Sequence, residues 1–224
     1  MGTIKVLIKG LIANIIFTAI LFICAGRTDY VQGWVFLCVN IVATVMNFLS
    51  IRKNGDLANE RSNLGEGVKS WDKLLLGLSA VIYLIIIITA GLDSGRFLWT
   101  ANFSWIISIS GVGIMMIGQV IFLTARSQNC FFSSVVRIQR ERGHVVCDTG
   151  LYKTVRHPGY LGMILSLVGI PFITTSMWSI IPTLIAIMLL LIRTSLEDKT
   201  LKSELDGYME YSNKTRYKLI PLIW

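Results

Sequence analysis

The sequence is poor in charge, in histidine and in paired cysteines. Charged residues make up 15% of its 224 residues, while 54% are hydrophobic; soluble proteins carry roughly 25% charged residues. With only His144 and His157, and four cysteines that form no CxxC pair, the sequence predicts neither a metal site nor disulfides. The shortage of charge excludes a soluble globular protein and indicates an integral membrane protein.

Long apolar blocks account for the hydrophobic excess. Four are long enough to cross a bilayer, which takes about 20 apolar residues, and they cover 4–25, 31–51, 74–92 and 104–125. The first block lacks an A-x-A cleavage pattern, so we expect an uncleaved membrane helix. Two shorter stretches, 160–173 and 178–192, predict a short helical hairpin. The expected fold class is therefore all-α: a polytopic integral membrane protein of about six membrane segments, forming a single domain over 1–224.

The basic residues are distributed unevenly along this topology. With an inside N-terminus and six crossings, only Arg27 and Arg96 of the 21 lysines and arginines fall outside. This asymmetry follows the positive-inside rule and predicts that both termini and the 126–156 loop face the cytoplasm. The net charge of +8 is expected to meet anionic lipid headgroups and not nucleic acid.

The first half of the chain, 1–103, is predicted to be scaffold. Its stretch 52–73 is polar and is expected to be a cytoplasmic loop with a short helix around 56–62, and a second turn is expected from Asp93 to Asn102. Interhelical hydrogen bonds account for the few polar residues inside the apolar segments, namely Asn14, Asn40, Asn47 and Gln119. Close helix packing is expected at the glycines that follow, Gly111, Gly113 and Gly118.

Residues able to do chemistry gather in 126–160 and 193–224. The run Arg156-His157-Pro158-Gly159-Tyr160 stands between a basic loop and an apolar segment, and Arg193 and Glu197 follow the last apolar segment. Ionisable groups beside hydrocarbon are costly and usually mark a functional site. Arg193 and Glu197 would share one face of a helix. Each feature alone also has a structural explanation, such as a surface ion pair or a proline in a first helical turn.

Together these stretches resemble the motif region of the isoprenylcysteine carboxyl methyltransferases, whose wider superfamily includes membrane phospholipid methyltransferases. The resemblance covers about 126–224 and leaves the first two helices outside; the methyltransferase core is predicted over 104–224. It rests on His144-Val145-Val146-Cys147, Gly150-Leu151-Tyr152, Arg156-His157-Pro158-Gly159-Tyr160-Leu161-Gly162, Arg193-Thr194-Ser195-Leu196-Glu197, Gly207-Tyr208, Tyr211 and Leu219-Ile220-Pro221.

The resemblance implies a pocket for S-adenosylmethionine. The matching cofactor-binding positions are His144, Val145, Val146, Cys147, Tyr152, His157, Pro158, Gly159, Tyr160 and Glu197. Arg193 matches the arginine assigned to the acceptor, where it would hold a carboxylate, so Arg193 and Glu197 are the expected catalytic residues. The acidic pair is here Glu197-Asp198, which departs mildly from the family pattern. Some members place a cofactor-contacting glutamine seven residues before His144; this chain has Arg137 there and Gln139 two residues on, so that contact stays unassigned.

The roles agree with the chemistry of S-adenosylmethionine, which carries a sulfonium, an ammonium and a carboxylate. Glu197 can supply an anion, and the backbone of 144–147 can supply donors. The glycine-rich turn between strand and helix that soluble proteins use is absent. We expect methyl esterification of a prenylcysteine-like carboxylate, on a lipophilic acceptor that arrives from the bilayer. Such a reaction depends mainly on positioning.

Three alternatives remain open at this point. N-methylation of an aminophospholipid headgroup would need a neutral His157 or a tyrosine to help deprotonate the amine. A reductase of the sterol type would use NADPH. A non-catalytic scaffold or carrier would keep an ancestral pocket. Binding of S-adenosylmethionine at 144–160 would separate these readings.

Overall fold

The computed structural model describes residues 2–52, 67–100 and 104–224, and within these ranges it contains helices and no strand. In chain order the elements are α1 (Gly2–Ala25), α2 (Val31–Arg52), α4 (Ser70–Ala90), the π-helix η1 (Gly91–Phe97), α5 (Trp105–Gln128), the 3-10 turns η2 (Arg140–Arg142) and η3 (Gly150–Lys153), α6 (Pro158–Thr174), α7 (Ile180–Glu204) and α8 (Tyr208–Lys214). The predicted all-α class is confirmed.

Among the described residues, five helices are long and apolar enough to cross a membrane: α1, α2, α4 together with η1, α5 and α7. The sixth apolar helix, α6, has 17 residues. Large apolar side chains on these helices are exposed, as expected for surfaces that face lipid; Ile15 is 62% and Ile109 is 66% exposed. The chain is therefore a multi-pass membrane protein, and the predicted number of apolar segments is confirmed.

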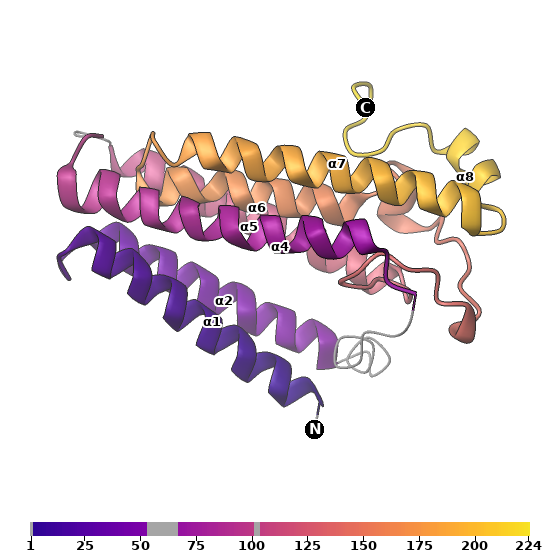
Figure 1. Ribbon diagram of the computed structural model, residues 1–224, viewed down its shortest axis with the longest axis horizontal. Helices are drawn as coiled ribbons and strands as arrows, with labels where there is room; N and C mark the ends of the chain where they lie inside the picture. The colour runs from indigo at the N-terminus through magenta and orange to yellow at the C-terminus, as the bar shows by residue number, and fades with distance from the viewer. Residues whose placement is uncertain (1, 53–66, 101–103) are drawn as a thin grey trace.

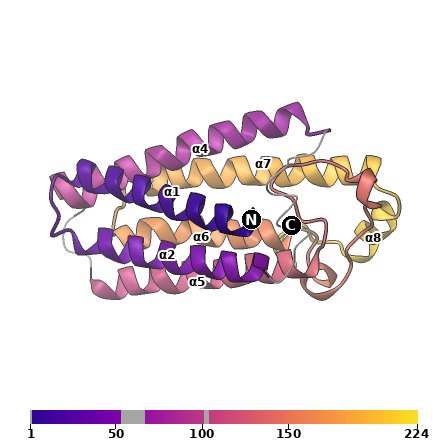
Figure 2. The ribbon, with the colours of Figure 1, turned by 90° about the horizontal axis from the view of Figure 1, so that it is seen from below.

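The helices lie side by side along the long axis of the molecule, and the segment after α5, α8 and the C-terminus gather toward one end (Figure 1). From below, α4 and α7 lie on one side and α2 and α5 on the other, with α6 between them (Figure 2). The N-terminus of α1 points toward the same end as α8 (Figure 1). That this end faces the cytoplasm stays a prediction.

Glycines allow α5 and α6 to approach closely. A Cβ on Gly111 would lie 2.5 Å from the backbone nitrogen of Ile173, and one on Gly118 would lie 2.6 Å from the carbonyl oxygen of Gly162. Side chains there would force the two helices apart, so the predicted role in packing is confirmed for Gly111 and Gly118. It is wrong for Gly113, where a Cβ would meet no described atom within 4 Å.

The interhelical hydrogen bonds expected in the first half are found for most of the polar residues. Asn14 of α1 donates to α2, and Asn47 of α2 accepts from Arg126 of α5 at 2.9 Å. Gln119 of α5 donates to a carbonyl of α2 at 3.5 Å. Asn40 differs, because its side chain donates to a carbonyl of its own helix.

One helix boundary differs from the prediction. Helix α4 begins at Ser70, so the loop predicted over 52–73 ends earlier and Asp72 lies, fully buried, in a first helical turn. Helix α7 continues beyond the apolar stretch that ends at residue 192, through Arg193 and Glu197 as their expected helical spacing requires, and ends at Glu204. The short helix predicted around 56–62 lies outside the described residues.

The predicted outer turn beginning at Asp93 is also different. Asp93 is fully buried in η1, where its carboxylate accepts hydrogen bonds from Thr100, Ser176 and the backbone of Trp178. The α6–α7 turn thus has its donors satisfied by an acid from the other hairpin. Residues 101–103, which the predicted turn also included, lie outside the described residues.

Candidate active site

A cavity of about 580 Å³ runs from the polar end of the bundle into its interior. This volume lies within the roughly 300–1,000 Å³ typical of small-molecule sites. Its lining extends along α6 from Tyr160 to Ile170 and along α7 from Glu197 to Ala186. At 1.5 Å per residue the cavity therefore reaches about 15 Å into the bundle, about half of a hydrocarbon core roughly 30 Å thick. We call the part lined by residues within 129–160, with Tyr208 and Tyr211, the polar limb of the cavity. The apolar limb is the part among α2, α4, α5, α6 and α7, lined by side chains such as Met115, Leu167, Ile170 and Leu190.

The irregular segment between α5 and α6 closes the polar limb, and Gln139 holds it together. The side-chain amide of this fully buried residue donates to the carbonyl of Phe131 at 2.7 Å, and its oxygen accepts from Arg142. Gln139 does not line the cavity, whereas Arg137 does. Gln139 is thus a structural residue. It is not a candidate for the cofactor-contacting glutamine that some family members have.

Residues 144–147 all line the cavity. Burial, with the positive charges of Arg142 and Arg137, lowers the pKa of His144 to about 4, so the imidazole is neutral at neutral pH. Its Nδ1 accepts the backbone N–H of Gln139 (3.3 Å), which leaves the proton on Nε2. The backbone N–H groups that follow, those of 145–147, donate to no described residue. The segment therefore offers several unused donors.

Asp198 is the centre of a buried network at the polar end. Arg156 donates from Nε and Nη2 to the two carboxylate oxygens at 2.7 and 3.0 Å. His157 Nε2 lies 3.2 Å and the Tyr208 hydroxyl 3.1 Å from Oδ1. Arg156 also donates through Nη1 to the carbonyls of 215–216. One carboxylate thus joins the start of α6, helix α7 and the C-terminal tail.

The tail is fixed against the start of α6 by further hydrogen bonds. The backbone N–H groups of 156–157 donate to the carbonyls of 217–218, both at 2.9 Å, and Tyr211 donates to the carbonyl of Tyr152 at 2.7 Å. Burial raises the pKa of Tyr152, Tyr208 and Tyr211, so all three remain neutral. The tail is therefore a structural wall of the cavity.

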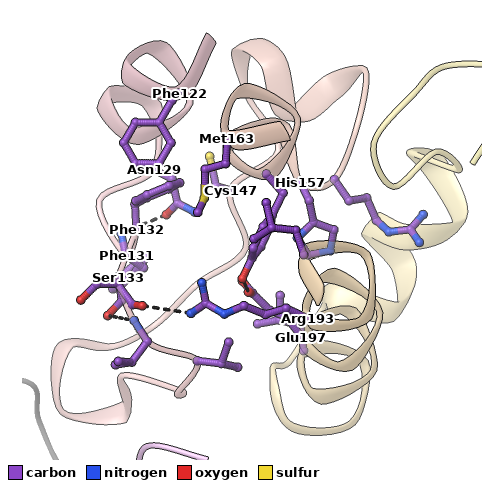
Figure 3. A pocket seen from close by; sticks show the side chains of 18 of the residues that line it. Phe122, Asn129, Phe131, Phe132, Ser133, Cys147, His157, Met163, Arg193 and Glu197 are labelled. Atoms are coloured by element: carbon purple, nitrogen blue, oxygen red, sulfur yellow. Dashed lines mark hydrogen bonds between the residues drawn. The ribbon is translucent and has the colours of Figure 1, made fainter. Parts of the chain in front are cut away.

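Arg193 and Glu197 lie on one face of α7 and both line the cavity, so the predicted helical spacing is confirmed. They stand opposite Phe122 and Met163 across the pocket (Figure 3). Tyr160 donates its hydroxyl proton to Glu197 Oε2 at 2.5 Å, and the Arg193 guanidinium carbon lies 5.4 Å from the centroid of the Tyr160 ring. In the part of the chain that the structure describes, Glu197 forms no ion pair.

Asp72, which the sequence reasoning missed, pairs with Arg193. Its oxygens accept from Arg193 Nε at 2.7 Å and Nη2 at 3.2 Å, and one also accepts from the backbone N–H of Val136 at 2.8 Å. The sequence pattern places Asp72 in the polar loop predicted over 52–73. The available signal was an acid at the beginning of an apolar run, since acids are favoured in the first turn of a helix.

Ten of the eleven predicted site residues line this cavity, namely His144, Val145, Val146, Cys147, Tyr152, His157, Gly159, Tyr160, Arg193 and Glu197. The exception is Pro158, which instead begins α6 at its first position. Gly159 is required by close packing, because a Cβ there would lie 2.7 Å from the ring of Phe132. The structure brings these residues together; their assignment to a cofactor or an acceptor stays a prediction.

Comparison with known proteins gives the chain a family. Residues 13–215 match the family described as "Protein of unknown function (DUF1295)". The chain belongs to this family. A stretch of 66 residues is also 36% identical to a "Probable protein-S-isoprenylcysteine O-methyltransferase" of Oryza sativa subsp. indica, and equally to a protein of the same name in subsp. japonica.

The match to the rice proteins covers 29% of this chain and 35% of each relative. The chain thus spans about a third of their length in the comparison. The resemblance to the isoprenylcysteine carboxyl methyltransferases predicted from the motifs is confirmed at the level of family.

Proposed function

We propose that this protein is an integral membrane methyltransferase that uses S-adenosylmethionine and O-methylates the carboxylate of a prenylcysteine-like lipophilic acceptor. One observation carries the proposal: Glu197, an acid without a cationic partner among the described residues, stands where the polar and apolar limbs of one cavity meet. The name of the similar rice proteins supports the same class of reaction.

The charge balance around the cavity supports a cationic ligand. Among the described residues, three arginines line the cavity and each is paired with a carboxylate: Arg137 with Glu141, Arg156 with Asp198, and Arg193 with Asp72. Glu197 is the one acid among the described lining residues. Glu197 is half-buried and accepts a hydrogen bond from Tyr160, but has no counter-charge within ion-pair distance among the described residues. A carboxylate beside an apolar lining favours a cation, and the sulfonium or ammonium of S-adenosylmethionine would supply it.

The donor set also fits the other end of S-adenosylmethionine. The unused backbone N–H groups of 145–147 and the Nε2–H of His144 would hold its carboxylate. Phe131 and Phe132 add an apolar wall. When bound, S-adenosylmethionine supplies an activated methyl group, which an ionised carboxylate accepts without first losing a proton. The residues of this chain then have only to bind, orient and exclude water.

The apolar limb suits the acceptor's hydrocarbon chain. Met115, Leu167, Ile170 and Leu190 line it, and its length of about 15 Å, at 1.5 Å per residue, accommodates an extended lipid chain. Arg193 stands at the junction of the limbs, where Nη1 would hold the acceptor's carboxylate. In this proposal 104–224 form the catalytic core on the cytoplasmic side, and the earlier helices complete the apolar limb.

N-methylation of an aminophospholipid is the second candidate, and one observation favours it. His157 Nε2 lies 3.2 Å from Asp198, and a carboxylate-oriented imidazole is an arrangement that general-base catalysis uses. An NADPH-dependent reductase fits less well, because its several phosphate groups favour a net positive lining. The described arginines of the cavity are each neutralised by an acid, and Glu197 adds a negative charge, whereas a single acceptor carboxylate needs only one free N–H edge such as Nη1 of Arg193.

Methyl transfer from radiolabelled S-adenosylmethionine tests the proposal. Detergent-purified protein is offered N-acetyl-S-farnesylcysteine or phosphatidylethanolamine, and the lipid product is treated with alkali. Release of the label as volatile methanol supports a carboxyl ester. Label retained in phosphatidylethanolamine supports N-methylation instead, and the absence of transfer to both acceptors would contradict the ester proposal.

A further inference from the structure

Asp72 occupies an unusual place for an acid in a membrane protein. It is fully buried and lies in the first turn of α4, outside the segment that carries the family motifs. The positive end of the helix dipole stabilises a carboxylate in a first turn. A buried carboxylate still needs a cation or several donors, and Asp72 has both.

Its contacts join three segments that are distant in the sequence. Asp72 accepts from Nε and Nη2 of Arg193, 121 residues away, and from the backbone of Val136 in the segment that closes the cavity. Arg193 Nη2 also donates to the carbonyl of Ser134 at 2.9 Å. The backbone of Lys69 adds a donation to the carbonyl of Val136 at 3.3 Å. Helix α4 thus fixes both α7 and the wall of the cavity.

This arrangement determines which part of Arg193 an acceptor can reach. A guanidinium has five N–H donors in a rigid fork. Asp72 and Ser134 take the Nε and Nη2 side, while Nη1 donates to no described residue. Arg193 lines the cavity, reaches toward the segment at Ser133 and lies over the Tyr160 ring (Figure 3). The remaining face is therefore the one presented at the junction of the two limbs.

We propose that Asp72 is a positioning residue, which aims the Nη1 edge of Arg193 at the carboxylate of the acceptor. This inference rests on the proposed function. The pair also keeps Arg193 compensated when no acceptor is present, because an isolated buried charge is strongly destabilising. Arg193 then recognises the acceptor by directed hydrogen bonds more than by net charge. The acceptor end of the site is consequently built by α4 as well as by the motif segments.

The first test is the isosteric variant Asp72→Asn, measured with whichever acceptor the wild type methylates. A charge-assisted hydrogen bond contributes about 1.5–3 kcal/mol, so misaiming Arg193 should raise the acceptor KM about tenfold or more. The affinity for S-adenosylmethionine, measured by calorimetry, should change by less than about threefold, a difference of under 1 kcal/mol. A role in folding alone would reduce the fraction of active protein and leave the acceptor KM of that fraction unchanged.

A double-mutant cycle with Arg193→Gln makes the test decisive. If Asp72 acts through Arg193, adding Asp72→Asn to Arg193→Gln leaves the acceptor KM where Arg193→Gln alone puts it. The double variant removes both charges together, so it avoids an unpaired buried charge and covers the case in which Asp72→Asn does not fold. Additive effects on the acceptor KM, or a wild-type acceptor KM in Asp72→Asn, would overturn the inference. The wild type tests the proposed function separately. If it binds S-adenosylmethionine and methylates its acceptor, a negative result with the variants counts against the role of Asp72 alone.

Discussion

Two buried arginine–aspartate pairs lie on either side of Glu197, and they connect different parts of the molecule. Arg156 and Asp198 both belong to the motif segments, and their pair ties the start of α6 to α7 and the tail. Arg193 and Asp72 join α7 to a helix outside those segments. Both pairs are bidentate hydrogen-bonded ion pairs. The first holds the segments of the polar limb together, and the second attaches that limb to the first half of the chain. The comparison indicates that the helices outside the motifs are more than scaffold.

Breaking the pair of Arg156 and Asp198 is expected to have the largest effect on stability and on cofactor binding. Asp198→Asn leaves Arg156 buried without its counter-charge, and removing one partner of a buried pair costs about 3–5 kcal/mol. We expect a lower thermal unfolding midpoint in detergent and loss of binding of S-adenosylmethionine. The matched control is Asp206→Asn, which changes an exposed carboxylate on the same tail. A wild-type midpoint in Asp198→Asn would refute the central role of this network.

The two arginines should separate the two halves of the reaction. Arg193→Ala is expected to leave the affinity for S-adenosylmethionine largely intact and to lower kcat/KM for the acceptor about 10–100-fold, since it removes charge-assisted hydrogen bonds. Arg156→Ala should instead impair cofactor binding, because the loop and tail lose their common anchor. Calorimetry and acceptor kinetics on both variants check the contrast. Loss of cofactor binding in Arg193→Ala would show that the division is wrong.

The segment that closes the cavity should add a smaller, pH-dependent effect. His144 has its pKa lowered from 6.5 to about 4, so the unfolded chain binds this proton more tightly than the folded one. Stability should therefore rise with pH between about 4 and 6.5 and be independent of this group above that range. The measurement is the difference in unfolding midpoint between pH 4.5 and pH 7, which should shrink in His144→Gln. An equal difference in both proteins would exclude the contribution of His144.

The smallest effect is expected from the exposed ion pair of Lys69 and Glu204, which lies near the buried pair of Arg193 and Asp72 in the sequence. Lys69, which precedes the first residue of α4, and Glu204 of α7 form an ion pair at 2.6 Å, but about a third of each side chain is exposed. Exposed pairs contribute about 0–1 kcal/mol, so Glu204→Gln should barely move the unfolding midpoint. A loss as large as that in Asp72→Asn would mean that the exposed pair, and not the buried one, holds α4 to α7.

The apolar segments could be predicted because membrane helices leave a strong local signal. The bounds of α1, α2 and α5 follow from runs of apolar residues, and the spacing of Arg193 and Glu197 predicted their common face. The end of α7 could not be predicted this way. Hydropathy counts apolar side chains, whereas the last three turns of α7 are polar and include Arg193 and Asp198, which are buried by partners elsewhere in the sequence.

The polar contacts between helices distant in the sequence could not be predicted from local sequence patterns either. Asp72 and Asp93 look like loop acids in the sequence, and each is fully buried by partners from another hairpin. Asp72 finds its partner 121 residues away. The motif residues themselves were predictable as a group, because the resemblance supplied their spacing.

Binding of S-adenosylmethionine to the purified protein tests the central claim most directly. Calorimetry would compare the wild type, Glu197→Ala and the control Glu210→Ala, whose carboxylate lies exposed on α8. The account predicts binding to the wild type and the control, and no measurable binding to Glu197→Ala. Wild-type affinity in Glu197→Ala would contradict the placement of the cationic ligand, and absence of binding to the wild type would contradict the proposed methyltransferase.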